Sequence, residues 1–234
     1  MGSIAAHSDV KLAGIWVRDE QQAAKLNVPD GVIVSSDLDA VVDAADVIVD
    51  FSLPEATSIV LAAVASRSTA LVCGVSGLSE QQLAELDSAA ESVAIVFDRN
   101  MSVGVAVLEN IVRQATAALG SDFDIEIHET HHVHKIDSPS GTALKLGEAI
   151  AEARGCATDD IRYEVERIGE VPGDHTVILA SATERLSLGH SVTTRQVFAD
   201  GALRAARWVV DQAAGRYSMQ DVLASSTAAK KTKC

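Results

Sequence analysis

Three imidazoles and one ammonium group lie within five residues, at His131, His132, His134 and Lys135. An imidazole can exchange a proton near neutral pH, and a lysine can hold a carboxylate by its charge. A helix start, Ser-Pro-Ser-Gly-Thr, follows at residues 138–142, and the exposed N–H groups of a helix N-terminus bind anions. Residues 129–143 therefore predict a site that grips and protonates a small acidic molecule. The alternative is a solvated polar loop that happens to be rich in histidine.

The same histidines permit a second interpretation, a metal site. On a strand, His128 and His132 would share a face and His134 would join them, so that these residues with His131 could bind zinc. Against this, the helix start that follows favours an anion, and no cysteine or carboxylate is clearly placed as a further ligand. We therefore expect no metal, and the metal content of the purified protein separates the two interpretations.

Composition limits the partners of the chain. Of its 234 residues 47% are hydrophobic but only 3% are aromatic, which is typical of aliphatic cores in which helices pack on a parallel sheet. The net charge of −14 argues against nucleic acid and against an anionic membrane surface. Three distant cysteines predict free thiols in the reducing cytoplasm, and no apolar run approaches the ~18 residues of a membrane span.

Short apolar strands alternate with helices through the first hundred residues. Strands are predicted at residues 10–17, 32–34, 46–51, 70–73 and 93–97, with helices at 21–26, 37–45, 54–65 and 79–92. Asp37 caps the second of these helices, and Ser79 with Gln82 forms a capping box for the last. The alternation predicts an α/β fold with a doubly wound parallel sheet. Ligands bind such sheets at the carboxyl ends of the strands, here residues 17–18, 51–52, 74–77 and 98–102.

The pattern changes after residue 102. A long helix is predicted at residues 103–119, a half-exposed strand at 123–129 and an amphipathic helix at 142–154. Three further strands, at residues 162–168, 175–181 and 185–192, predict an antiparallel sheet. A final alanine-rich helix is predicted at residues 201–213. This change of composition indicates a second domain.

The N-terminal residues of the chain differ from the usual start of a dinucleotide-binding sheet. Such a sheet opens with a strand, a Gly-rich turn and a helix that together hold the pyrophosphate. No GxGxxG pattern is present, and residues 1–7 look like the end of that turn. We interpret residues 10–17 as the second strand and expect a shortened chain that binds its nucleotide weakly and is less stable. The alternative is an ordinary start on a different fold.

The chain resembles the 4-hydroxy-tetrahydrodipicolinate reductase family, also called dihydrodipicolinate reductase, of bacterial and plant lysine synthesis. The family pattern E-x-H-H-x-x-K-x-D-[AS]-P-S-G-T-A is complete at residues 129–143, and residues 49–52, 173–176, 198–203 and 217–223 also match. The resemblance implies a Rossmann-like cofactor domain, residues 1–101 with 196–234, that lacks its first strand and Gly-rich turn. It also implies an α+β domain, residues 102–195, that binds substrate and forms a homotetramer.

The resemblance further implies reduction of a small cyclic dicarboxylate, 4-hydroxy-tetrahydrodipicolinate, by NADH or NADPH without a metal. His131 matches the proton donor and acceptor, and Lys135 matches the second catalytic residue. The matching substrate-binding positions are His132, Gly141 and Thr142. The physics agrees, because a hydride that reaches the substrate leaves negative charge that needs a proton. Lysine and helix-end N–H groups can hold a carboxylate.

The cofactor positions depart from the family pattern. Its G-T-T-G turn is Gly-Val-Ser-Gly at residues 74–77, and its A-P-N-F-S stretch is Asp-Arg-Asn-Met-Ser at residues 98–102. Val17 replaces the acid that often meets the adenosine ribose, whereas Arg18 can still meet a 2′-phosphate, so NADPH fits at least as well as NADH. The candidate cofactor-binding residues are Arg18, Gly74, Val75, Ser76, Asp98, Arg99, Asn100 and Met101. The alternative function is an impaired relative that keeps only the oligomeric scaffold.

Overall fold

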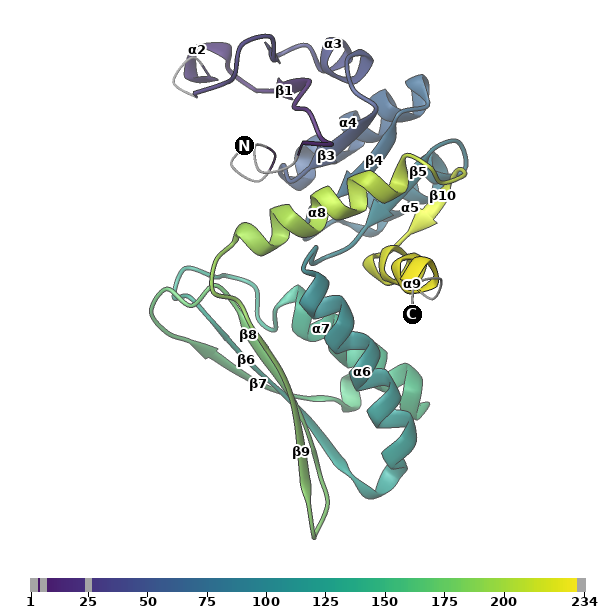
Figure 1. Ribbon diagram of the computed structural model, residues 1–234. Coiled ribbons are helices and arrows are strands. Elements are labelled where there is room, and N and C mark those ends of the chain that lie inside the picture. The colour runs from purple at the N-terminus through teal and green to yellow at the C-terminus, as the bar shows by residue number, and fades with distance from the viewer. Residues whose placement is uncertain (1–3, 5–7, 24–26, 231–234) are drawn as a thin grey trace. The chain divides into compact units, whose positions relative to one another are not determined.

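The computed structural model describes residues 4, 8–23 and 27–230, which form parts of two compact units. Unit 1 comprises residues 1–98 and 199–234, and unit 2 comprises residues 99–198 (Figure 1). The predicted end of a Gly-rich turn at residues 1–7 lies outside the described residues except for residue 4, and the predicted helix end at residues 24–26 lies outside them as well. Among the described residues no helix is long and apolar enough to cross a membrane.

Unit 1 is built on parallel sheets, as predicted. A two-stranded sheet joins β1 (Gly14–Trp16) to β2 (Ile33–Ser35). A second sheet has the order β10-β5-β4-β3, with strands β3 (Val47–Asp50), β4 (Ala70–Cys73), β5 (Ala94–Phe97) and β10 (Gly215–Tyr217). In the usual 3-2-1-4-5-6 order, strand 1 would lie between β1 and β3, and among the described residues no strand joins these two.

The helices of unit 1 begin at the predicted signals. Asp37 caps α3 (Leu38–Asp43) by accepting from two backbone N–H groups, and α5 (Glu80–Ala90) begins with the predicted capping box. A proline occupies the first turn of α4 (Pro54–Arg67), where its missing N–H costs nothing. These helices and α2 (Glu20–Ala23) connect the strands. Val64, Leu71, Leu86 and Ile95 are among the fully buried residues of the core.

The C-terminal elements of unit 1 correct the prediction of a final helix at residues 201–213. That helix begins earlier, as α8 (Gln196–Val209), and two elements follow it, β10 and α9 (Met219–Lys230). Three residues are too few to show a strand period, so only pairing with β5 identifies β10. The start of α9 did carry a signal, because Ser218 and Asp221 have capping-box spacing and the Ser218 N–H donates to the Asp221 carboxylate.

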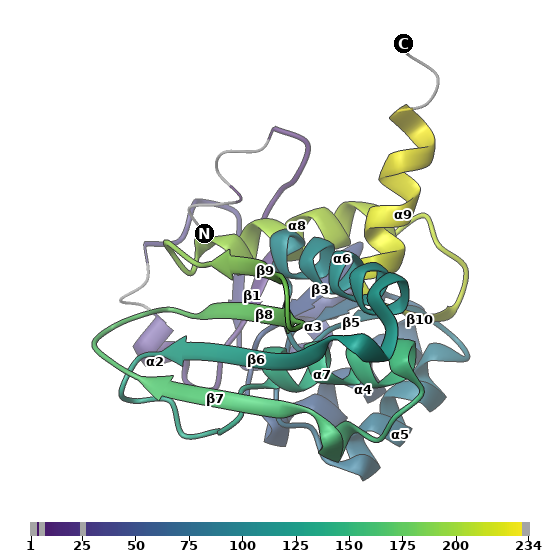
Figure 2. The same ribbon diagram turned by 90° about the horizontal axis from the view of Figure 1, so that it is seen from below.

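Unit 2 is a four-stranded sheet with two helices, α6 (Val103–Leu119) and α7 (Gly141–Arg154), on one face (Figure 2). The sheet has the order β7-β6-β8-β9, with strands β6 (Asp124–His131), β7 (Arg162–Arg167), β8 (Asp174–Ala180) and β9 (Arg185–Ser191). Its core includes Val112, Ile127, Leu146 and Leu179, none of which is exposed. The predicted long helix at residues 103–119 is confirmed.

The prediction of an antiparallel sheet is wrong for one strand. β8 and β9 pair in antiparallel fashion, but β7 lies parallel to β6. Parallel neighbours need a long crossover, and α7 supplies it because it lies between β6 and β7 in the chain. β6 also ends at His131, two residues later than predicted, which places this histidine on the strand.

Candidate active site

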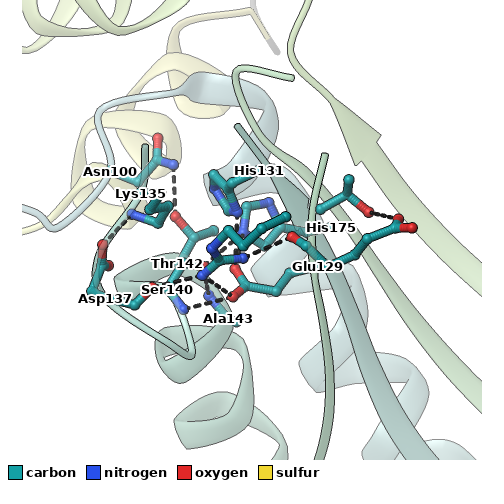
Figure 3. Close-up of polar contacts among 12 residues, drawn as sticks. Asn100, Glu129, His131, Lys135, Asp137, Ser140, Thr142, Ala143 and His175 are labelled. Carbon is teal, nitrogen blue, oxygen red and sulfur yellow. Dashed lines mark hydrogen bonds and ion pairs between the residues drawn. The ribbon is translucent and has the colours of Figure 1, made fainter. Parts of the chain in front are cut away.

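The chemistry-bearing residues of unit 2 lie at the end of β6, in the loop that follows and at the start of α7 (Figure 3). Side chains alternate between the two faces of a strand. On β6 this buries Glu129 and His131 with Ile127, while His128 and Thr130 occupy the other face. Register then sets the neighbours of the buried pair: Glu129 lies opposite His175 of β8.

Glu129 is the centre of a buried polar cluster, and its side chain has no exposed surface. Its Oε1 accepts hydrogen bonds from the Ser140 backbone N–H at 2.9 Å and from Arg167 Nη2 at 3.1 Å. Its Oε2 lies 3.1 Å from His131 Nδ1 and 3.7 Å from His175 Nε2. Burial alone would raise the pKa of Glu129, but its contacts with His131, Ser140 and Arg167 outweigh it and lower the pKa to about 2.

His175 connects the cluster to the start of α7. Its ring packs edge-on against His131, with centroids 5.0 Å apart, and its Nε2 lies 3.0 Å from Ser140 Oγ. The same Oγ caps α7 by accepting from the Ala143 N–H. Burial, followed by the neighbouring His131, lowers the pKa of His175 to about 4. His175 is therefore neutral at physiological pH.

Lys135 lies in the loop between β6 and α7. Its Nζ is 2.7 Å from Asp137 Oδ1, and about a fifth of its side chain is exposed. Burial would raise the pKa of Asp137, but hydrogen bonds from Lys135 and from the Gly141 N–H contribute to lowering it. Asp137 thus binds the ammonium and one of the helix-end donors that were predicted to hold a substrate carboxylate.

The first turn of α7 contains the other predicted substrate-binding positions. Gly141 is the first helical residue, and a Cβ built there would meet only Arg99, at 3.8 Å, so its backbone is open on that side. Thr142 Oγ1 accepts from Asn100 Nδ2 at 2.8 Å, and Asn100 Oδ1 accepts from the Ser102 N–H at 2.8 Å. Asn100, predicted to bind the cofactor, is therefore held beside Thr142.

His132 is the one predicted substrate-binding residue outside this cluster. Its Nε2 lies 3.1 Å from Arg195 Nη2, and its ring centroid is 6.0 Å from that of His134. Partial burial and the Arg195 guanidinium lower the pKa of His132. A neutral ring beside a guanidinium can offer a polar surface to an anion.

The histidines of the predicted metal set do not converge. His128 contacts Glu126 on the other face of β6, and His134 contacts Glu170. A different set, Glu129, His131 and His175, has ligand atoms within 4.8 Å of one another. The Arg167 guanidinium already binds that carboxylate, and a fixed cation there disfavours a metal ion.

The predicted cofactor residues of unit 1 follow the carboxyl ends of parallel strands. Arg18 follows β1 and is exposed. At the end of β4, Gly74 has no room for a side chain, because a Cβ would lie 2.4 Å from the Phe51 ring. Val75 is buried and Ser76 is exposed. Asp98 follows β5 and is buried, and its Oδ2 accepts from the Met219 N–H at 3.3 Å.

The remaining predicted cofactor residues lie in unit 2. Arg99 forms an ion pair with Glu148 at 2.8 Å, and Met101 is almost fully buried. The Arg99 side chain therefore has a partner within unit 2. Asn100, bonded to Thr142, is the member of this group that contacts a predicted substrate-binding residue.

Sequence reasoning missed the partners that hold the site together. His175, Ser140 and Arg167 were given no role, although His175 lies in a stretch that matches the family pattern. A signal for Glu129 existed, because residues two apart on a strand share a face. The contacts of His175 and Arg167 depend on the register of β8 and β7 against β6, which short-range patterns do not contain.

Two family models together match most of the chain. One, described as the N-terminus of dihydrodipicolinate reductase, matches residues 1–101, and the other, described as its C-terminus, matches residues 104–223. A 4-hydroxy-tetrahydrodipicolinate reductase of Alkalilimnicola ehrlichii is 46% identical, over 82% of this chain and 79% of that protein. One of Pseudoalteromonas translucida is 41% identical, over 94% of this chain and 90% of that protein.

A solved structure shares the fold. The dipicolinate-bound dihydrodipicolinate reductase of Paenisporosarcina sp. TG-14 superposes with a TM-score of 0.78 at 20% identity. The match covers 93% of this chain and 91% of that one. The fold is therefore that of a Rossmann domain joined to an α+β domain.

Proposed function

The chain belongs to the dihydrodipicolinate reductase family, and we propose that it reduces 4-hydroxy-tetrahydrodipicolinate to tetrahydrodipicolinate with NADH or NADPH in lysine and diaminopimelate biosynthesis. One observation carries the proposal at the level of the site: a proton-transfer histidine ends β6, and a carboxylate-binding lysine lies in the loop that leads from it into a helix N-terminus. That arrangement suits a substrate that is acidic and must be protonated.

Substrate binding and nucleotide binding belong to different units. Residues 102–195 bind the substrate, because the polar cluster around Glu129 lies wholly within them. Residues 1–101 with 196–234 bind the nucleotide. These boundaries lie close to those of the two compact units.

The carboxyl ends of β3, β4 and β5 suit a dinucleotide, because they are adjacent and parallel. Gly74 fits this role because its lack of a side chain lets the backbone pass close to Phe51. The other proposed contacts of unit 1 with the dinucleotide are made by Val75, Ser76 and Arg18. The segment from Asp98 to Met101 connects this unit to the substrate domain. When bound, the cofactor supplies the hydride.

His131 exchanges the proton. The substrate gains negative charge on reduction, and an imidazolium within hydrogen-bond distance can neutralise it, which is worth roughly 10²–10⁴-fold in rate. Its other ring nitrogen faces the Glu129 carboxylate at 3.1 Å, so a positive charge on the ring has a buried counter-ion.

Lys135, Gly141 and Thr142 hold the substrate carboxylates, and His132 lines the same end of β6. Asp137 binds the Lys135 ammonium and the Gly141 N–H. A substrate carboxylate offers the same chemistry, so it replaces or shares these contacts of Asp137. Lys135 therefore acts in catalysis by fixing the dicarboxylate beside His131.

We also propose a homotetramer that works in the cytoplasm. One face of the unit 2 sheet carries α6 and α7, whereas on the other face polar side chains of β6 such as His128 and Thr130 are only partly covered. A sheet face without a helix layer is a natural surface for contact between copies of the chain. No nucleic acid or membrane partner is proposed.

A rate assay tests the proposed activity. The purified full chain is mixed with freshly formed 4-hydroxy-tetrahydrodipicolinate and either NADH or NADPH, and loss of the reduced cofactor is followed together with the mass of the product. We expect substrate-dependent oxidation of at least one cofactor and formation of tetrahydrodipicolinate. Oxidation of neither cofactor by a folded protein would contradict the proposal.

A further inference from the structure

The two nitrogens of the His131 ring have different surroundings. Nδ1 lies 3.1 Å from Glu129 Oε2 and has no other partner in the described part of the chain. Nε2 lies beside Gly173, where a Cβ would come within 3.0 Å of it. Gly173 has φ +151°, a conformation that residues with a Cβ rarely adopt. A glycine thus keeps the Nε2 side of the ring open.

The Glu129 carboxylate is fixed from its other end. Oε1 receives the Ser140 N–H and Arg167 Nη2, and the whole side chain is buried. Oε2 is therefore the oxygen that faces the imidazole. The two atoms meet the distance of an ion pair but not the alignment of a good hydrogen bond, and catalytic hydrogen bonds often tighten only when substrate is bound.

We propose that Glu129 is a positioning residue that keeps the proton of His131 on Nδ1, so that Nε2 is the atom that exchanges a proton with the substrate. A carboxylate can only accept, so a neutral ring that faces it must carry its hydrogen on Nδ1. When Nε2 also gains a proton, the carboxylate stabilises the imidazolium. The identity of the substrate rests on the proposed function, but the position of the proton does not.

The Glu129→Gln variant reverses this arrangement without changing the shape of the side chain. The amide oxygen stays toward Ser140 and Arg167, because both are donors. The amide NH₂ then faces His131 Nδ1, which must accept, so the neutral ring carries its hydrogen on Nε2. The same substitution removes the carboxylate that would accept from the His131 imidazolium.

The chain contains a matched control on the same strand. Glu126 Oε2 lies 3.1 Å from His128 Nε2, so this is also a Glu–His pair two residues apart on β6, on the opposite face. We expect Glu129→Gln to lower kcat about 100-fold or more, with KM changed less than about threefold. We expect Glu126→Gln to leave both constants near those of the parent.

The decisive readout is the ¹⁵N signal of the His131 ring at a pH where the ring is neutral, assigned by loss of the signal in His131→Gln. The parent protein should show Nδ1 protonated, and Glu129→Gln should show Nε2 protonated. A parent ring with its hydrogen on Nε2 overturns the proposal, even if Glu129→Gln fails to fold. If Glu129→Gln raises KM and leaves kcat unchanged, Glu129 serves to hold the start of α7 and not to position His131. That result also overturns the proposal. Failure of the rate assay in the parent chain would instead count against the proposed function, because the ring signal needs no substrate.

Discussion

The charged residues of the site are paired with one another. Lys135 contacts Asp137, and His131 faces Glu129. Residue types in the 129–143 segment predicted an imidazole that exchanges a proton and a lysine that holds a carboxylate, and the family resemblance assigned the first role to His131. Both roles remain predictions. The pairing was not predictable, because which carboxylate takes which cation depends on the turn of the loop and on Arg167, which lies 38 residues from Glu129.

The proton-exchange role predicts a specific kinetic defect. Replacing His131 with Gln should lower kcat by roughly 10²-fold or more and leave the affinity for substrate nearly unchanged. His134→Gln is the matched control, because His134 lies in the loop that follows His131 but is exposed and contacts Glu170. Steady-state kinetics on both variants checks this, and near-parent turnover in His131→Gln would remove His131 from the mechanism.

The carboxylate-binding role predicts the opposite defect. Lys135→Ala should weaken binding of dipicolinate, a dicarboxylate probe, by roughly 10- to 100-fold, because a charge-assisted hydrogen bond is worth about 1.5–3 kcal/mol. Asp137→Asn keeps the ammonium and removes its internal partner, so it should bind the probe at least as tightly as the parent. Calorimetric titration measures both, and unchanged affinity in Lys135→Ala would show that its ammonium does not face the substrate.

At the scale of elements, local signals predicted most helices and every strand of unit 1 except β10. Capping residues and apolar periods are short-range features, so α3, α5 and α6 were predicted close to their observed bounds. Strand direction in unit 2 was not predictable in this way. The strand period is the same in parallel and antiparallel pairs, and β7 runs parallel to β6 only because α7 carries the chain back across the sheet.

The polar cluster that joins β6, β8 and α7 predicts loss of stability in acid. The pKa of His175 falls from an ordinary 6.5 to about 4 in the fold, so between these values the unfolded chain binds a proton that the folded chain does not. Stability from this group is complete above about pH 6.5 and is lost as the pH falls toward 4, by about 3 kcal/mol in all. Glu129, whose pKa falls from 4.5 to about 2, extends the loss to lower pH.

Urea unfolding at a series of pH values checks this expectation. The free energy of unfolding of the parent should decrease from pH 6.5 to 4. In His175→Gln, which cannot take up a proton in this range, the decrease should be smaller by about the contribution of one histidine. An equal decrease in both proteins would show that His175 does not control the acid sensitivity.

At the scale of the whole molecule, composition and alternation predicted a parallel-sheet unit followed by an α+β unit, and the fold confirms this class. The return of the last elements to unit 1 was expected from the family resemblance, but β10 and its pairing with β5 were not. That pairing joins residues more than a hundred positions apart, so no local pattern carries it. The proposed homotetramer is also a property of the whole molecule.

Sedimentation at several protein concentrations tests the oligomer. The chain has a mass of 24.5 kDa, and we expect a species of four times that mass that does not dissociate on moderate dilution. Activity should sediment with it. A protein that is active and monomeric at every concentration would contradict the tetramer but leave the site unaffected.

The most direct test of the central claim, that this chain reduces 4-hydroxy-tetrahydrodipicolinate with a nicotinamide cofactor, is transfer of a label. The full chain is incubated with freshly formed substrate and with NADH or NADPH deuterated at the transferable position, and the product is measured by mass spectrometry. We predict tetrahydrodipicolinate that carries the cofactor's deuterium and whose formation requires His131. Product without the label, or equal labelling in the absence of the protein, would contradict the account.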